Sequence, residues 1–203
     1  MRAPVEVYLA SSNPGKLGEF RALARSLAPS AMLRLELQPA FDSLPGFEEN
    51  APTFAENAAG KALHYSRLHD GLVLADDSGL VVPALGGAPG VLSARYAGPS
   101  ATSAKRMAKL LDELRGQTGQ KRRAYFVCAI ALAQRGRATA VVTGRVDGQI
   151  LQAPVGTGGF GYDPIFYFPP LHQSFAELSP EEKNAHSHRG KAFRRVLGFL
   201  QNG

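Results

Sequence analysis

A short apolar run that stops on two adjacent acids constrains the fold of this chain more than any other feature of its sequence. Leu72–Ala75 is apolar and is followed at once by Asp76 and Asp77. Acidic side chains are rarely buried without a partner, and neighbouring carboxylates oppose each other's ionisation. We therefore expect a buried strand that ends at these acids, as strands do at the ligand-binding edge of open α/β sheets. A solvated loop tip is the alternative.

Strand and helix patterns alternate along the chain and predict an α/β fold. Residues 5–9 have the period-two pattern of a strand, and helical spacing runs from Lys16 until Pro29 stops it. Thr53 and Glu56 form a capping-box pattern that predicts a helix beginning at Phe54. The other expected elements are strands over 33–37, 124–133, 138–146 and 165–168, a hairpin at 134–137, and helices through 107–114, from Ser179 and from about Ser187 to Leu200; the helix from Phe54 is expected to reach Leu68.

Length and composition favour one ordinary globular domain. The chain has 203 residues and no internal repeat or linker, so a single domain over 1–203 is expected. Cys128 is the only cysteine, which excludes a disulfide framework and fits a reducing cytosol. The start of the sequence lacks the apolar core of a signal peptide, and no apolar run is long enough to cross a bilayer. We expect a cytoplasmic protein without a membrane partner.

An excess of basic residues favours anionic partners. The formal net charge is +6 at pH 7, which suits nucleic acid, a membrane surface or free phosphates. The charge by itself does not choose among them. The basic residues are scattered rather than gathered in one stripe, which argues against a nucleic-acid partner; examples are Arg21, Arg25, Lys105, Arg122 and Arg195.

A polar loop between the first strand and the first helix predicts a phosphate site. Free backbone N–H groups and the helix dipole favour negative charge there, and Lys16 adds a positive charge. The loop is not a Walker A motif, since Leu17 stands where that motif has its Mg²⁺-binding hydroxyl. A plain helix cap is the alternative. The candidate phosphate-binding residues are Ser11, Ser12, Asn13, Pro14, Gly15 and Lys16.

Two pairs of acids offer oxygen ligands for a metal ion. Glu48 and Glu49 lie in an expected loop, and Asp76 and Asp77 follow the apolar run. Oxygen ligands without a soft ligand select Mg²⁺ or Mn²⁺. A surface acidic loop is the alternative. Lys61, between the two pairs, is by itself an ordinary solvated helix residue.

A glycine-rich segment with two aromatic residues fits a planar base. Within Gly158–Pro164 a ring can stack on Phe160 or Tyr162, while Asp163 or backbone groups read its edge. Glycines such as Gly161 allow the backbone to approach closely. A β-turn with core aromatics is the alternative.

Basic residues gather around the expected start of the last helix. Lys183, His188 and Arg189 belong to this group. Positive side chains near a helix start oppose its dipole, so an anionic ligand would relieve the conflict. Solubility or a subunit contact explains His188 and Arg189 equally well.

Seven motifs, taken together and in order, resemble the inosine triphosphate pyrophosphatase family. They cover the chain from Val5 to about Leu200. One segment departs from the family pattern, because Glu48–Pro52 stands where members commonly have an acid followed by Thr-Gly. The resemblance favours Glu49 as a ligand and leaves Glu48 open. The motifs are Ser11–Lys16, Thr53–Ala58, Ala75–Leu80, Leu85–Gly90, Ser93–Tyr96, Gly159–Pro164 and Ser187–Gly190.

The resemblance implies a fold and an activity. The fold would be an elongated mixed β-sheet core flanked by helices, with a central active-site cleft, in a homodimer. The activity would be hydrolysis of ITP, dITP and XTP to the monophosphate and pyrophosphate. The cofactor would be Mg²⁺, with Mn²⁺ as a tolerated substitute.

The resemblance also implies roles for individual residues. Glu49 and Asp77 would hold the metal ion. Asp77 would also activate or orient water, with Asp76 and Lys16 assisting. The remaining residues would bind the substrate: Ser11 to Lys16 and Lys61 at the triphosphate, and Ser78, Phe160, Gly161, Tyr162, Asp163, Lys183, His188 and Arg189 in the nucleotide pocket.

Two other functions are alternatives to the enzyme. A basic nucleic-acid-binding module would use the surface charge and the aromatics Phe160 and Tyr162, and would bind with steep salt dependence and no hydrolysis. A non-catalytic nucleotide sensor would have a degenerate site, which the complete set of acids and lysines argues against. We expect a purine nucleoside triphosphate as the partner, and no stable complex with nucleic acid.

Overall fold

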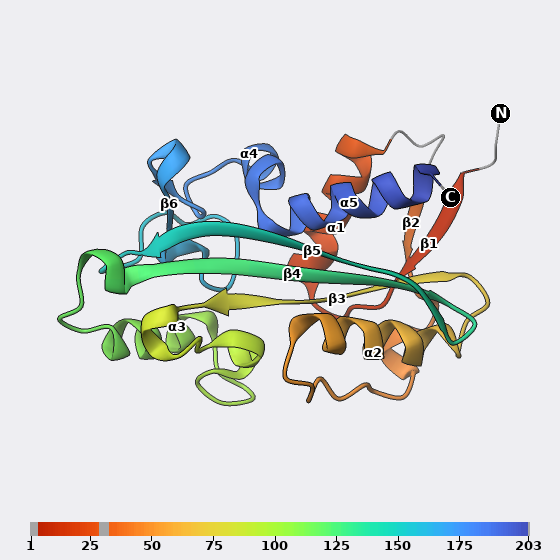
Figure 1. Cartoon of the computed structure of the whole chain (residues 1–203), viewed down its shortest axis with the longest axis horizontal. Coiled ribbons are helices and arrows are strands. Elements are labelled where there is room, and N and C mark those ends of the chain that lie inside the picture. Colours follow the sequence, from red (N-terminus) through yellow and green to blue (C-terminus); the bar gives the residue numbers. More distant parts are fainter. Residues whose placement is uncertain (1–3, 29–32, 203) are drawn as a thin grey trace. The chain divides into compact units, whose positions relative to one another are not determined.

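The chain forms an α/β fold around a mixed sheet, as the sequence predicts. The computed structural model describes residues 4–28 and 33–202. Seven described strands lie in the order β2-β1-β3-β4-β5-β6-β7, with β1 parallel to β2 and β3, and β6 antiparallel to β5 and β7 (Figure 1). The strands are β1 Val5–Leu9, β2 Leu33–Leu37, β3 Leu72–Val81, β4 Arg123–Gln134, β5 Arg137–Ile150, β6 Phe166–Phe168 and β7 Gln173–Ser174; the helices are α1 Pro14–Leu27, α2 Phe54–Ser66, α3 Ser103–Glu113, α4 Pro180–His186 and α5 His188–Asn202.

Local start signals place most helices where the sequence predicts them. The side chain of Asn13 accepts the Lys16 N–H and starts α1 two residues before the expected position. Pro29, the expected stop of this helix, lies outside the described residues. Thr53 caps α2, and Ser179 begins α4 through a capping box. The sequence did not predict β7 or the short 3₁₀ helices Phe41–Ser43, Pro83–Leu85, Gly90–Arg95, Gly119–Arg122, Asp163–Ile165 and Pro169–Leu171.

The expectation that the strand ends at the two acids is wrong. β3 passes through Asp76 and continues to Val81, because the apolar pattern resumes and Leu80 is fully buried. The strand that stops here is β1, whose last sheet hydrogen bond joins Ala10 N to Leu74 O at 2.8 Å. The loop after β1 therefore begins next to the part of β3 that carries the acids.

The described chain divides into two compact units, and each has its own apolar core. The first unit contains residues 1–77, 128–144 and 188–203, and the second contains residues 78–127 and 145–187. Strands β3, β4 and β5 contribute residues to both units. The interpretation of residues 1–203 as a single domain stays a prediction.

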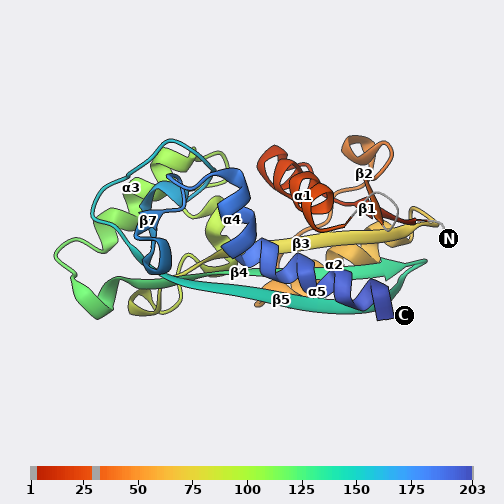
Figure 2. The same cartoon turned by 90° about the horizontal axis from the view of Figure 1, so that it is seen from above.

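In the first unit, helices cover both faces of the sheet. α1 and α5 lie side by side on one face, and α2 lies on the other (Figures 1 and 2). Leu74 packs in the cluster that contains Phe20 of α1, whereas Val73 packs in the cluster with α2. Since side chains alternate along a strand, Asp76 faces α1 and α5, and Asp77 faces α2.

A buried arginine joins the ends of several segments in the second unit. Arg122 is 7% exposed. Its guanidinium donates to the main-chain oxygens of Leu114 at 3.0 Å, Gln117 at 3.4 Å and Ile150 at 2.6 Å, and also to that of Leu151. Hydrogen bonds from a charged donor contribute more than neutral ones, so this residue is important for the stability of the unit.

We expect Arg122→Ala to lower the free energy of unfolding by about 3 kcal/mol, because buried carbonyl oxygens lose their charged donor. Urea unfolding followed by circular dichroism measures this. Arg123→Ala, at the exposed neighbouring position, is the control and should change stability by less than about 0.5 kcal/mol. Equal effects of the two changes would contradict the role assigned to Arg122.

Candidate active site

Asp76 is fully buried and faces two positive charges. It is 0% exposed. Lys16 Nζ lies 2.9 Å from Asp76 Oδ2, and a guanidinium nitrogen of Arg189 lies 3.8 Å from the same oxygen. Burial alone would raise the pKa of Asp76, but the charges of Lys16 and Arg189 outweigh it and hold the pKa below its usual value. Asp76 is therefore ionised at neutral pH and holds the Lys16 ammonium group in place.

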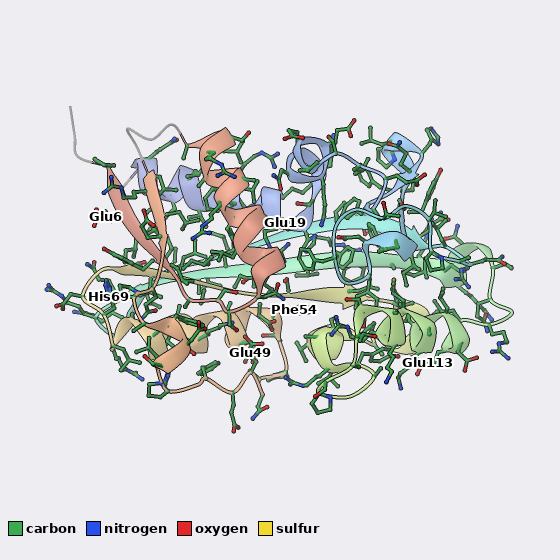
Figure 3. All side chains as sticks on the ribbon, turned by 180° about the vertical axis from the view of Figure 1, so that it is seen from behind. Glu6, Glu19, Glu49, Phe54, His69 and Glu113 are labelled. Carbon is green, nitrogen blue, oxygen red and sulfur yellow. The ribbon has the colours of Figure 1, made fainter. Side chains whose placement is uncertain are left out.

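Arg189 is enclosed by acids of the first unit. It is 2% exposed and pairs with Glu19 of α1 as well as with Asp76. Figure 3 shows Glu19 on α1 and Glu49 on the α2 side of the sheet. Burial alone would lower the pKa of Arg189, but the carboxylates raise it, so the guanidinium is always charged. Arg189, predicted as pocket lining, is thus placed to support Asp76.

Asp77 has an unusually basic carboxylate. It is 5% exposed, and Asn57 Nδ2 donates to its Oδ2 at 3.0 Å. Burial, followed by the negative charge of Glu49, raises the pKa of Asp77 to about 6, although Lys16 opposes the shift. An ordinary aspartate has a pKa of about 4. Asp77 is thus ionised at pH 7 and still accepts a proton more readily than most carboxylates.

The acidic loop before α2 brings one glutamate to Lys61. Glu49 Oε1 lies 2.8 Å from Lys61 Nζ. Burial alone would lower the pKa of Lys61, but the negative charges of Glu49, Asp76 and Asp77 raise it. Glu48 is exposed and accepts a hydrogen bond from Asn50 Nδ2 at 2.8 Å. Of the two glutamates that the sequence left open, Glu49 is the one whose negative charge acts on Asp77.

The polar loop after β1 is folded as a helix cap. Ser11 is 2% exposed, and its Oγ accepts the Asn13 N–H at 3.3 Å. Asn13 Oδ1 accepts the Lys16 N–H at 3.1 Å. Ser12 and Asn13 are exposed, and Gly15 is partly exposed; the side chain of Pro14 lies outside the described set. The loop thus presents the N-terminus of α1 next to Lys16, an arrangement that suits an anion.

Glu49 and Asp77 fit a hard divalent cation. Within 4–28 and 33–202 there is no cluster of three or more His, Cys, Asp or Glu side chains placed to hold a metal ion. Mg²⁺, however, is usually bound through one or two carboxylates, with water and substrate phosphates completing its shell. The charge of Glu49 already disfavours ionisation of Asp77. A cation would relieve that conflict.

In the second unit, Asp163 organises the glycine-rich segment. Asp163 Oδ2 accepts Lys183 Nζ at 2.6 Å and the Phe160 N–H at 2.7 Å. Lys183 Nζ also lies 4.7 Å from the centre of the Phe160 ring. Gly159 has φ of +69°, and a Cβ there would collide with the Asp163 carboxylate. Glycine is therefore required at this turn. Phe160 remains partly exposed.

Other predicted pocket residues differ in accessibility. Tyr162 is 4% exposed and donates its hydroxyl hydrogen to Ser93 O at 3.0 Å, so its ring packs in the core. Ser78 follows Asp77 in β3 and is partly exposed, whereas His188 is 5% exposed at the start of α5. Of the two aromatics proposed for stacking, Phe160 is the more accessible.

Sequence reasoning missed two residues that contact the predicted site residues. Asn57 binds Asp77, and Glu19 binds the arginine beside Asp76. A helical projection offers a signal for both, since Asn57 stands one turn before Lys61 and Glu19 one turn after Lys16.

The protein is an α/β protein with a mixed sheet, and it carries two lysine–carboxylate pairs, Lys16–Asp76 and Lys61–Glu49. The sequence model of the Ham1 family matches residues 7–199, and the chain belongs to this family. No helix in the described parts of the chain has the length and apolar character needed to cross a membrane.

Several relatives are similar over nearly their full length. A dITP/XTP pyrophosphatase of Geobacillus kaustophilus is 50% identical over 191 residues, which are 94% of this chain and 92% of that protein. The structure of a HAM1 protein from Coxiella burnetii has a TM-score of 0.86 and 43% identity, covering 98% of this chain and 100% of its own. The Staphylococcus aureus Ham1 protein has a TM-score of 0.83 and 38% identity, covering 97% and 98%. The family resemblance and the α/β class predicted from the sequence are confirmed.

Proposed function

We propose that this protein hydrolyses dITP, ITP and XTP to the nucleoside monophosphate and pyrophosphate, and so removes non-standard purines from the nucleotide pool. One observation carries the proposal. The buried, basic carboxylate of Asp77 interacts electrostatically with two lysines, Lys16 and Lys61, which are themselves held by acids. Relatives named dITP/XTP pyrophosphatases, 44% and 50% identical, support it.

Asp77 is the proposed base. Water transfers a proton to its carboxylate while the water oxygen forms a bond to one phosphorus of the α–β anhydride. The bond from that phosphorus to the bridging oxygen breaks, and pyrophosphate separates from the monophosphate. A carboxylate with a pKa of about 6 suits this role, because it is ionised at pH 7 and above.

Lys16 and Lys61 are the proposed phosphate-binding cations. The loop from Ser11 to Lys16 adds the N-terminus of α1 to this site. Fixed positive charges that meet the negative charge developing on phosphate oxygens stabilise the transition state. Glu49 and Asp77 would hold Mg²⁺, or Mn²⁺ in its place, which would supply further charge neutralisation at the phosphates.

The Phe160–Asp163 segment is the proposed base-recognition site. Phe160 offers a ring for stacking, and Asp163 and Lys183 offer polar groups close to it. Preference for a 6-oxo purine follows if the site donates to that oxygen, because adenine carries a donor at the same position. A site built on such hydrogen bonds rejects the wrong base strongly.

Pyrophosphate release from ITP, dITP, XTP, GTP and ATP at alkaline pH, with and without Mg²⁺, tests the proposal. We expect metal-dependent release mainly from the first three nucleotides. Absence of release from all five by folded protein would overturn the proposal, and steeply salt-dependent binding to DNA or RNA would then favour the nucleic-acid-binding alternative.

We expect Phe160→Ala to raise KM for ITP by at least about fivefold and to change kcat by less than about threefold. Stacking of a base on an aromatic ring contributes about 1–3 kcal/mol. It strengthens binding of the base and takes no part in the proton transfer assigned to Asp77. Steady-state kinetics measures both parameters. Phe199→Ala, which removes an aromatic that is 42% exposed on α5, is the control. An unchanged KM in Phe160→Ala would remove Phe160 from the base site.

We further propose that the protein is a cytoplasmic homodimer. The single cysteine and the family resemblance support this. Light scattering coupled to size exclusion measures the oligomeric state, and a monomer at micromolar concentration would contradict the proposal.

A further inference from the structure

Asn57 contacts both the loop that carries Glu49 and the carboxylate of Asp77. It lies in α2 and is 0% exposed. Its Oδ1 accepts the Ala51 N–H at 2.8 Å, and its Nδ2 donates to Ala51 O at 3.3 Å and to Asp77 Oδ2 at 3.0 Å. One neutral side chain therefore joins two segments that each supply a candidate metal ligand.

The chemistry of the partners fixes the orientation of the Asn57 amide. A backbone N–H can only donate, so the partner of Ala51 N is the amide oxygen. An ionised carboxylate can only accept, so the partner of Asp77 is the amide nitrogen. Because both partners require the same orientation, rotation of the amide by 180° would break both hydrogen bonds. The contact holds Asp77 in a defined direction.

The loop that leads to Ala51 is packed along the same helix. The ring of Phe47 lies against Gly60, where a Cβ would come within 2.6 Å of Phe47 Cζ. His64 Nε2 lies 2.9 Å from Pro45 O. These contacts hold the loop 45–51 against α2, and Asn57 links the loop to β3.

We propose that Asn57 is a positioning residue that fixes the carboxylate of Asp77 relative to that of Glu49, and so sets the affinity of the pair for a divalent cation. It acts through Asp77 and does not touch the substrate. The inference rests on the proposed function. Residues that orient metal ligands commonly contribute about 10–100-fold to metal affinity or activity.

The main test compares Asn57→Ala with a control matched for stability. Gln38→Ala removes another buried amide, which donates to the Tyr65 carbonyl at the far end of α2 at 3.2 Å and does not contact the acids. The melting temperature should fall in both variants, because each loses a buried hydrogen bond.

Binding of Mn²⁺ without nucleotide, followed by the electron paramagnetic resonance signal of the free ion, separates the two variants. We expect Kd for Mn²⁺ to rise about tenfold or more in Asn57→Ala and to stay unchanged in Gln38→Ala. We expect kcat for ITP at subsaturating Mg²⁺ to fall by a similar factor in Asn57→Ala, with KM for ITP at saturating Mg²⁺ changed by less than about threefold. Wild-type Kd and kcat in folded Asn57→Ala would overturn the inference.

Asn57→Asp keeps the test decisive if the alanine variant does not fold. The new carboxylate still accepts the Ala51 N–H, but it repels Asp77 instead of donating to it. We expect a kcat at least about tenfold lower in a folded protein, and an unchanged kcat would overturn the inference. Failure of the proposed function is distinguishable from failure of this inference. If the wild type does not hydrolyse ITP, its Kd for Mn²⁺ can still be compared with that of Asn57→Ala.

Discussion

Asp77→Asn is expected to lower kcat for pyrophosphate release from ITP by at least about 10³-fold. The amide cannot accept the water proton, and general base catalysis commonly contributes about 10²–10⁴-fold. It also removes one of the two carboxylates proposed to hold the cation. A steady-state assay of pyrophosphate release at saturating Mg²⁺ measures kcat. Asp147→Asn, at an exposed position of β5, is the control and should keep the wild-type rate.

The stability of Asp77→Asn distinguishes loss of chemistry from loss of fold. The pKa of Asp77 is raised to about 6 in the folded protein, above its ordinary value of 3.8. The protonated form is thus favoured by folding, and this contribution is lost as the pH rises through about 6. At pH 8 without metal, the wild type carries a buried charge that the amide lacks. We therefore expect the melting temperature of Asp77→Asn to equal or exceed that of the wild type. A turnover close to that of the wild type would show that Asp77 is not the base.

Arg189→Met is expected to cause the largest loss of stability among these variants. The guanidinium is 2% exposed and lies between Glu19 and Asp76. Its removal leaves Glu19 without this partner and leaves Asp76 with less positive charge around it. Removing one member of a buried ion pair costs about 3–5 kcal/mol. Urea unfolding measures the change, with Arg21→Met on the exposed side of α1 as the control.

A double-mutant cycle shows whether the loss comes from the unpaired acid. Glu19→Gln in the Arg189→Met background removes one of the two carboxylates. We expect it to recover about 1 kcal/mol or more, because groups in direct contact are coupled by about 0.5–3 kcal/mol. Strict additivity of the two changes, or an effect of Arg189→Met no larger than that of Arg21→Met, would contradict the buried ion-pair interpretation.

The helix starts and strand patterns could be predicted from the sequence because their causes are local. Thr53 and Ser179 cap helices through bonds to residues three positions away. The path of β3 could not be predicted in the same way. Two acids inside a strand look like its end until their partners are known, and Arg189 reaches Asp76 from α5, at the other end of the chain.

The candidate site shows the same division. Residue type selected Lys16, Asp77 and the pair Glu48–Glu49 as candidates, and the family resemblance added Lys61 and favoured Glu49. Their pairing depends on how α1 and α2 pack on opposite faces of β3. Asn57 escaped notice because its place one turn before Lys61 does not show that its amide is buried against Asp77. Its importance depends on what lies within about 3 Å of it, which only the folded chain specifies.

The close fit of Phe47 against Gly60 restricts how α2 can change by mutation. Glycine inside a helix is about 1 kcal/mol less favourable than alanine, so Gly→Ala is ordinarily an easy way to strengthen a helix. At position 60 the added methyl group would meet Phe47 Cζ at 2.6 Å, so the Phe47 ring beside the segment that leads to Glu49 would have to shift. A variant of this protein selected only for heat resistance would therefore not gain the full benefit of Gly→Ala here, since the position of α2 with the poorest helix propensity is also the one that leaves room for the Phe47 ring.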